Sequence, residues 1–208
     1  MVRTEKGLLI YNLDNDELAF RVGQRLENSP PENIIIERYN GPKDYPDSLL
    51  SKKKFYQLNF TDQERLYKQS QEYERKIVHP IIKDTIRKYT PKFDLELHST
   101  PISLFDDFYQ WFKTRYIWLG IGVYPTNKRL NSIIFKEFPE HQQQLVALKD
   151  LPVYQVTEEN NTKDCFHSFH GLYVEIWHRD DNPISQDSIT VGEILIRDLC
   201  EFIMSNYK

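Results

Sequence analysis

The stretch KFDLELHST, residues Lys92 to Thr100, constrains the fold more than any other part of the chain. Its short apolar-rich run, Phe93 to Leu97, predicts a strand. The residues His98 to Thr100 follow this run, and Pro101 is expected to end the strand. A histidine just beyond the carboxyl end of a strand lies where open α/β sheets bind their ligands. The stretch therefore predicts a central strand that leads into a functional site.

A strand, a helix and a second strand are predicted before this stretch. Gly7 to Tyr11 has a short apolar strand pattern, and Glu17 to Asn28 carries apolar residues at helical spacing. Ser29-Pro30-Pro31 is expected to end the helix. Ile34 to Ile36 is apolar throughout, so we expect a strand that is buried on both faces. This order is typical of a βαβ unit and predicts an α/β fold, with a mixed central sheet flanked by helices in three layers.

The rest of the chain continues this alternation. The pattern from Thr61 towards Tyr89 predicts a long helix, which a capping box of Thr61 with Glu64 opens and Pro80 kinks or divides. Further elements are predicted from apolar runs and amphipathic patterns: strands at Leu119 to Tyr124, Val153 to Val156 and Leu172 to Trp177, and helices at Phe138 to Leu148 and Gln186 to Tyr207.

Length and composition exclude several classes of protein. The chain has 208 residues, of which 39% are hydrophobic, enough for one sizeable domain with a packed core. A formal net charge of -4 argues against a nucleic-acid binder. Cys165 and Cys200 form no disulfide framework, and the chain has neither a membrane-length apolar run nor a signal-peptide pattern. We therefore expect one cytoplasmic domain, residues 1–208, with no nucleic-acid or membrane partner.

Three groups of residues are candidates for chemistry. Asp14 and Glu17 stand at the junction of the first strand and helix, where the alternative is a capped helix start. His98 follows the central strand, and its alternative is a hydrogen-bonded structural histidine. Glu175 lies in an apolar strand, where a buried carboxylate is costly unless it is paired or bound to a metal. If that strand is half exposed, Glu175 points harmlessly outward with Tyr173 and Trp177. Both interpretations of Glu175 remain open at this point.

Together these residues have the composition of an open zinc site. An Asp-x-x-Glu pair and a distant histidine would leave one zinc position for water, whose pKa zinc lowers to about 7. A nearby carboxylate can then accept the proton of that water. A second cluster follows no standard zinc spacing: Cys165, His167, His170 and His178. The chain has no phosphate-binding loop and no G-x-S-x-G motif.

The same residues give the chain a resemblance to the succinylglutamate desuccinylase/aspartoacylase family, which is related to the zinc carboxypeptidases. LLIYNLDNDELAFRVGQRL has Asp14 to Glu17 where the family has H-G-N-E between a strand and a helix. FYQLNFTD keeps Leu58-Asn59 of a D-L-N-R-x-F-like segment. DLELHST is similar to D-L-H-x-T, with His98 in the place of its histidine. LYVEIWHRDD has Glu175 where the family has E-V-G-P.

This resemblance implies a zinc carboxypeptidase-like fold, without the smaller C-terminal β domain that many members carry, and a role for each matched residue. Three residues would bind Zn2+: Asp14, Glu17 and His98. Glu175 would activate the water and protonate the leaving amine, and Lys52 resembles an arginine that polarises the scissile carbonyl. Asn59 would contact the substrate.

The implied activity is zinc-dependent hydrolysis of an amide bond, in a small-molecule or peptide substrate. The enzyme would be a deacylase of an N-acyl amino acid or carboxypeptidase-like. The sequence departs from the family pattern at Asp14, at Phe60 in place of an arginine, and at Trp177-His178 in place of Gly-Pro. These departures motivate the alternative, which is a catalytically inactive member that serves as a ligand- or protein-binding module.

Overall fold

A computed structural model describes residues 4–12, 17–39, 58–101, 119–125, 130, 132–134, 145–147, 171–178 and 184–207. The predicted βαβ unit is confirmed: β1 (Gly7–Asn12) is followed by α1 (Glu17–Asn28) and by β2 (Ile34–Tyr39), which pairs with β1 in parallel. The expectation that β2 is buried on both faces is wrong. It lies at an edge of the sheet that the described strands form, and its central residues are only half buried.

The strands of the described segments form one mixed sheet. It contains β3 (Asp94–Pro101), β4 (Leu119–Pro125), β5 (Leu145–Ala147) and β6 (Leu172–His178), in the order β2-β1-β3-β6-β4-β5. The first four strands in this order are parallel, and β4 runs antiparallel to β6. The mixed sheet predicted from the sequence is therefore confirmed.

Two predicted elements need correction. The strand predicted to end at Leu97 continues through His98 to Pro101, which is the last residue of β3, where its missing amide hydrogen no longer interrupts a longer ladder. His98 therefore lies within the strand and not beyond it. Residues 145–147, predicted as part of a helix, form β5, because they pair with β4. The strand predicted at Val153 to Val156 lies outside the described residues.

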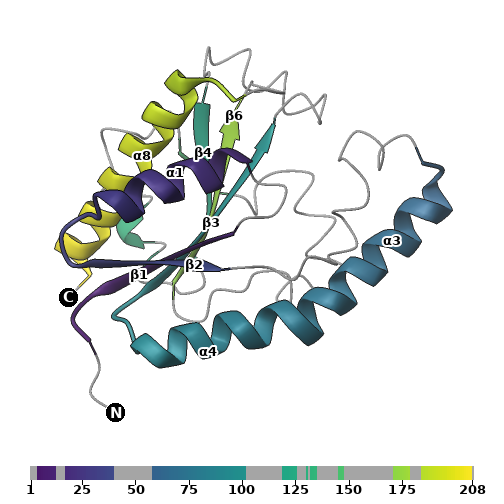
Figure 1. Ribbon diagram of the computed structural model, residues 1–208, viewed down its shortest axis with the longest axis horizontal. Helices are drawn as coiled ribbons and strands as arrows, with labels where there is room; N and C mark the ends of the chain where they lie inside the picture. The colour runs from purple at the N-terminus through teal and green to yellow at the C-terminus, as the bar shows by residue number, and fades with distance from the viewer. Residues whose placement is uncertain are drawn as a thin grey trace.

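Helices cover both faces of the sheet (Figure 1). α1 and the long helix α8 (Gln186–Asn206) lie together on one face, and α4 (His79–Tyr89) lies on the other. The core under α1 and α8 is apolar, with Leu9, Leu95, Leu97, Val174 and Ile176 from the strands. A smaller core joins α4 to the sheet through Leu8, Ile10, Tyr39, Val78, Ile82 and Ile86. An α/β sheet between helical layers is therefore confirmed.

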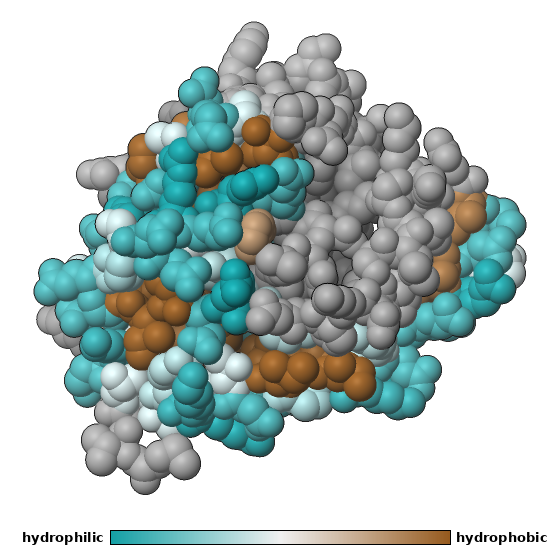
Figure 2. Space-filling model, viewed as in Figure 1, coloured by the Kyte–Doolittle hydropathy of each residue, from teal (hydrophilic) through white to brown (hydrophobic). Residues whose placement is uncertain are grey.

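The long helical pattern is divided as predicted. α3 (Phe60–Tyr73) leads into a π-helical turn, η2 (Glu74–Val78), and α4 begins directly after it with Pro80 in its first turn. Proline is tolerated there because the first-turn amides have no partner within the helix. Apolar side chains reach the surface over this junction (Figure 2), where Ile77 and Ile81 are exposed. None of the helices in the described segments has the length and apolarity needed to cross a membrane.

α1 approaches β1 closely because it carries a glycine at the contact. An added Cβ at Gly23 would lie 2.3 Å from Cγ of Tyr11. The Tyr11 ring is buried, and its hydroxyl donates a hydrogen bond to Glu27 on the same helix. Burial, together with the neighbouring Glu27 carboxylate, raises the pKa of Tyr11, so this donor keeps its proton at neutral pH. α1 therefore fixes the Tyr11 ring at two points: Gly23 packs against the ring carbons, and Glu27 accepts a hydrogen bond from the hydroxyl.

This contact predicts that Gly23→Ala destabilises the protein. Alanine is favoured over glycine in a helix by about 1 kcal/mol, but overpacking a core costs about 1–3 kcal/mol. Because the added Cβ would lie only 2.3 Å from the ring, we expect the cost in the upper part of this range and a net loss of about 1–2 kcal/mol in the free energy of unfolding, measured in urea. Gly192→Ala on α8 is the control, since its Cβ would meet Val22 at 2.9 Å and its next neighbour at 3.6 Å. A loss in the control as large as in Gly23→Ala would contradict this account.

Candidate functional site

The candidate site lies on the face of β3 that α4 covers. β3 pairs in parallel with β6, so that His98 stands opposite Glu175 and Glu96 stands opposite Tyr173. Paired residues of neighbouring strands project to the same face, and side chains two apart on one strand share that face. The sheet therefore brings four polar side chains of β3 and β6 together, in a register that the main-chain ladder fixes.

Tyr173 connects the two predicted functional residues. Its ring stacks on the His98 imidazole, with ring centroids 4.5 Å apart and planes at 17°. Its hydroxyl donates a 2.8 Å hydrogen bond to Oε2 of Glu175. Glu175 is buried, as is Trp177. Of the two interpretations left open by the sequence, the outward-facing one is wrong, and Glu175 is a buried, hydrogen-bonded carboxylate.

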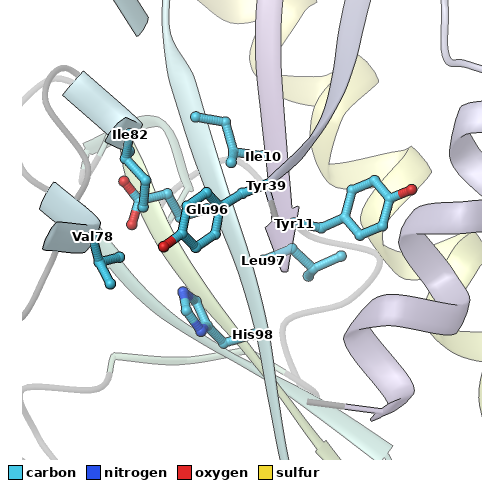
Figure 3. A pocket seen from close by; sticks show the side chains of 8 residues that line it. All are labelled: Ile10, Tyr11, Tyr39, Val78, Ile82, Glu96, Leu97 and His98. Carbon is cyan, nitrogen blue, oxygen red and sulfur yellow. The ribbon is translucent and has the colours of Figure 1, made fainter. Parts of the chain in front are cut away.

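Glu96 is a buried residue of this face that sequence analysis missed. Its side chain is 1% exposed. It lines a cavity of about 20 Å³, which is room for about one water molecule. Figure 3 shows Glu96, Tyr39 and His98 on the α4 side of the sheet, with Val78 and Ile82. A signal was present in the sequence, since Asp94, Glu96 and His98 alternate with leucines.

The opposite face of β3 carries the start of α1. The amide of Ala19 donates a buried 3.0 Å hydrogen bond to Oγ of Ser99, the residue after His98. Glu17, two residues before Ala19, is thereby anchored near the same strand end. Its carboxylate is exposed and lies 3.8 Å from the Arg21 guanidinium. The start of α1 is thus held against the residue after His98, on the other face of the sheet from the candidate site, and the Glu17 side chain is paired at the surface.

The remaining predicted site residues lie partly outside the described part of the chain. Asp14 and Lys52 lie outside the described residues, as do three members of the second cluster, Cys165, His167 and His170. His178 is buried, on the α1 side of the sheet, where its strand neighbour Ile176 packs into the apolar core. Within the part of the chain that the structure describes, no three His, Cys, Asp or Glu side chains are grouped so as to hold a metal.

The donor chemistry of the site suits zinc, although the described ligand set is incomplete. Imidazole nitrogen and carboxylate oxygen are ordinary zinc ligands. His98 presents the first, and Glu17 carries the second within two residues of the Ala19–Ser99 bond. A third ligand would have to come from Asp14, which lies in the segment between β1 and α1. The donor types are therefore those of a zinc site, but among the described residues Glu17 and His98 are not grouped to hold a metal.

Asn59 has a structural role that the sequence did not reveal. Its Oδ1 accepts a 3.0 Å hydrogen bond from the amide of Asp62, and its Nδ2 donates a 2.8 Å bond to the Asp62 carboxylate. This is the geometry of an N-cap at the start of α3. The predicted capping box of Thr61 with Glu64 is wrong, because the helix already begins at Phe60. To contact a substrate, Asn59 would have to break its two hydrogen bonds to Asp62.

No protein-family model, no curated protein and no solved structure matches this chain. The family resemblance therefore depends on the matched motif residues themselves. The structure places two of these residues, His98 and Glu175, opposite each other on adjacent strands.

The cap predicts a local effect of Asn59→Ala. Loss of an asparagine cap costs about 1 kcal/mol, a factor of about five in an equilibrium constant. We expect amide hydrogen exchange of Asp62 to be about fivefold faster, measured by NMR. Thr61→Ala is the matched control and should leave this rate within about twofold. An equal effect of both changes would contradict the Asn59 cap and favour the predicted capping box at Thr61.

Cys200 can be excluded as a nucleophile. Burial in the core raises the pKa of its thiol to about 12. Because this folded pKa lies above the unfolded value, the thiol favours the native state at low pH, and this contribution is lost as the pH rises towards 12. In a Cys165→Ser background, we expect iodoacetamide to leave the native protein unmodified at pH 8.5 and to alkylate it in urea, as mass spectrometry would show. Rapid native alkylation would contradict the burial of Cys200.

Proposed function

We propose that the chain is a zinc-dependent hydrolase of an amide bond, either a deacylase of an N-acyl amino acid or a carboxypeptidase-like enzyme. Its fold would be a divergent version of the zinc carboxypeptidase sheet. The ordered motifs that resemble the succinylglutamate desuccinylase/aspartoacylase family support this proposal. The observation that carries it is the pairing of His98 with Glu175 on adjacent parallel strands. A metal-binding histidine beside a carboxylate is the combination that metal-assisted hydrolysis needs.

In this proposal, Asp14, Glu17 and His98 hold the metal. Bound zinc would supply a water molecule that ionises near neutral pH. Glu17 would exchange its contact with Arg21 for the metal. An exposed ion pair contributes about 0–1 kcal/mol, whereas zinc binds to structural protein sites with about 10 kcal/mol or more. The surface position of Glu17 is therefore a small obstacle to metal binding.

Glu175 carries the proton in this proposal. Its carboxylate takes a proton from the attacking water and delivers it to the leaving amine. Burial strengthens its interactions with reacting groups, because the surroundings screen charge less than water does. On its other side, β4 has Gly122 opposite Glu175, and a glycine adds no side chain next to the carboxylate. Lys52 would place a cation near the scissile carbonyl as a point charge.

The first experiment measures the zinc content of the untagged protein by mass spectrometry. We expect about one zinc per chain, lost in His98→Ala and kept in Glu175→Gln. On a panel of N-acyl amino acids and peptides, Glu175→Gln should lower the rate by about 10²–10⁴-fold, since it removes the proton acceptor. Absence of zinc after loading, or full activity of Glu175→Gln, would refute the proposal.

Glu37→Gln is the matched control for this experiment. Glu37 also accepts a hydrogen bond from a tyrosine hydroxyl, that of Tyr89 at 2.7 Å. It lies on the edge strand β2, with β1 between it and β3. We therefore expect Glu37→Gln to retain both zinc and activity. A loss of activity in this variant would mean that Glu175→Gln reports general damage to the sheet.

A second candidate function is a ligand- or protein-binding module without catalysis. Two observations favour it: the surface pair of Glu17 with Arg21, and the use of Asn59 as a helix cap. This candidate predicts that the protein takes up no zinc and that His98→Ala leaves ligand binding unchanged. The zinc measurement therefore separates the two functions.

A further inference from the structure

We propose that Tyr173 is a positioning residue, which orients Glu175 through its hydroxyl and His98 through its ring. The inference deepens the proposed function and rests on it for the chemical roles of Glu175 and His98. The motif resemblance assigns no role to Tyr173, which stands two residues before Glu175 and outside the matched motif. Its assignment comes from the two contacts that it makes on the α4 side of the sheet.

The hydroxyl contact follows from the alternation of β6. Residues two apart on a strand project from the same face, so Tyr173 and Glu175 lie side by side. The hydroxyl donates to Oε2 of Glu175 at 2.8 Å, and Glu175 itself is 3% exposed. Tyr173 therefore fixes the orientation of the Glu175 oxygens.

The ring contact follows from the register between β3 and β6. His98 stands opposite Glu175, so Tyr173 is its diagonal neighbour, within the reach of an aromatic side chain. The imidazole lies almost flat on the phenol ring, with planes at 17° and centroids 4.5 Å apart. Stacking restricts rotation of the imidazole about its own bonds. A ligand whose orientation is restricted in advance loses less freedom when it binds a metal.

The hydroxyl role is tested by Tyr173→Phe in metal-free protein. Carbon-13-labelled glutamate side chains are observed by NMR at one fixed pH, and the Glu175 carboxyl signal is assigned as the one missing in Glu175→Gln. Without the hydroxyl, we expect this signal to shift, because the hydrogen bond to Oε2 is lost. The phenyl ring keeps the packing, so the thermal midpoint serves only as a check that the variant is folded.

Tyr89→Phe is the matched control, since it removes a tyrosine hydroxyl that donates to Glu37 at 2.7 Å. It should move the Glu37 signal and leave Glu175 unchanged. A Glu175 carboxyl signal that is the same in Tyr173→Phe as in the parent would overturn the hydroxyl role.

The ring role is tested on the ring protons of His98, assigned with His98→Gln. In the parent protein and in Tyr173→Phe, we expect these protons to be shifted upfield by the stacked ring, and in Tyr173→Met to lose this shift. Unshifted His98 protons in the parent would overturn the ring role, a result that does not depend on whether the methionine variant folds. Neither of these two measurements needs zinc or substrate. Failure of the proposed function would appear instead as absent zinc or absent hydrolysis.

Discussion

The alternation of side chains along β3 is the constraint on which the rest of this structure depends. β3 lies between β1 and β6 in a parallel ladder, so its two faces are fixed with respect to both neighbours. Leu95 and Leu97 enter the apolar core under α1 and α8. Glu96 and His98 project to the side covered by α4. A slip of one residue would place charges in the main core, which is costly enough to define the register.

Much of the fold could be predicted from local patterns in the sequence. β1, α1 and β6 lie close to their predicted positions, because apolar periodicity and flanking Pro and polar residues act within a few residues of one another. The errors arose where pairing with a strand distant in the sequence determines the secondary structure. β3 continues to Pro101 because β6 pairs with its last residues, and residues 145–147 form a strand because β4 pairs with them. The partial exposure of β2 depends on its edge position, which no local pattern contains.

The candidate site was predictable in its parts but not in its arrangement. His98 and Glu175 were identified by residue type and by their strands, yet their adjacency depends on the sheet order. Tyr173 and Glu96 were missed because neither is a matched motif residue, and the alternation of polar and apolar side chains around each also suits an exposed face. Asn59 was interpreted as a substrate contact, while its local bonds to Asp62 make it a helix cap. Short-range hydrogen bonding and long-range pairing thus each changed the interpretation of a residue.

The order of strands also has a consequence for how the chain folds. β6 lies between β3 and β4, although it follows both of them and β5 in the sequence. Neither β4 nor β5 can therefore join the N-terminal strands until β6 has been synthesised and inserted. Contacts between segments so far apart in the sequence close slowly, because the entropy of a long loop must be lost first. During synthesis, the edge of β3 that later pairs with β6 therefore lacks this partner, at the stage when a nascent chain is most exposed to wrong pairing.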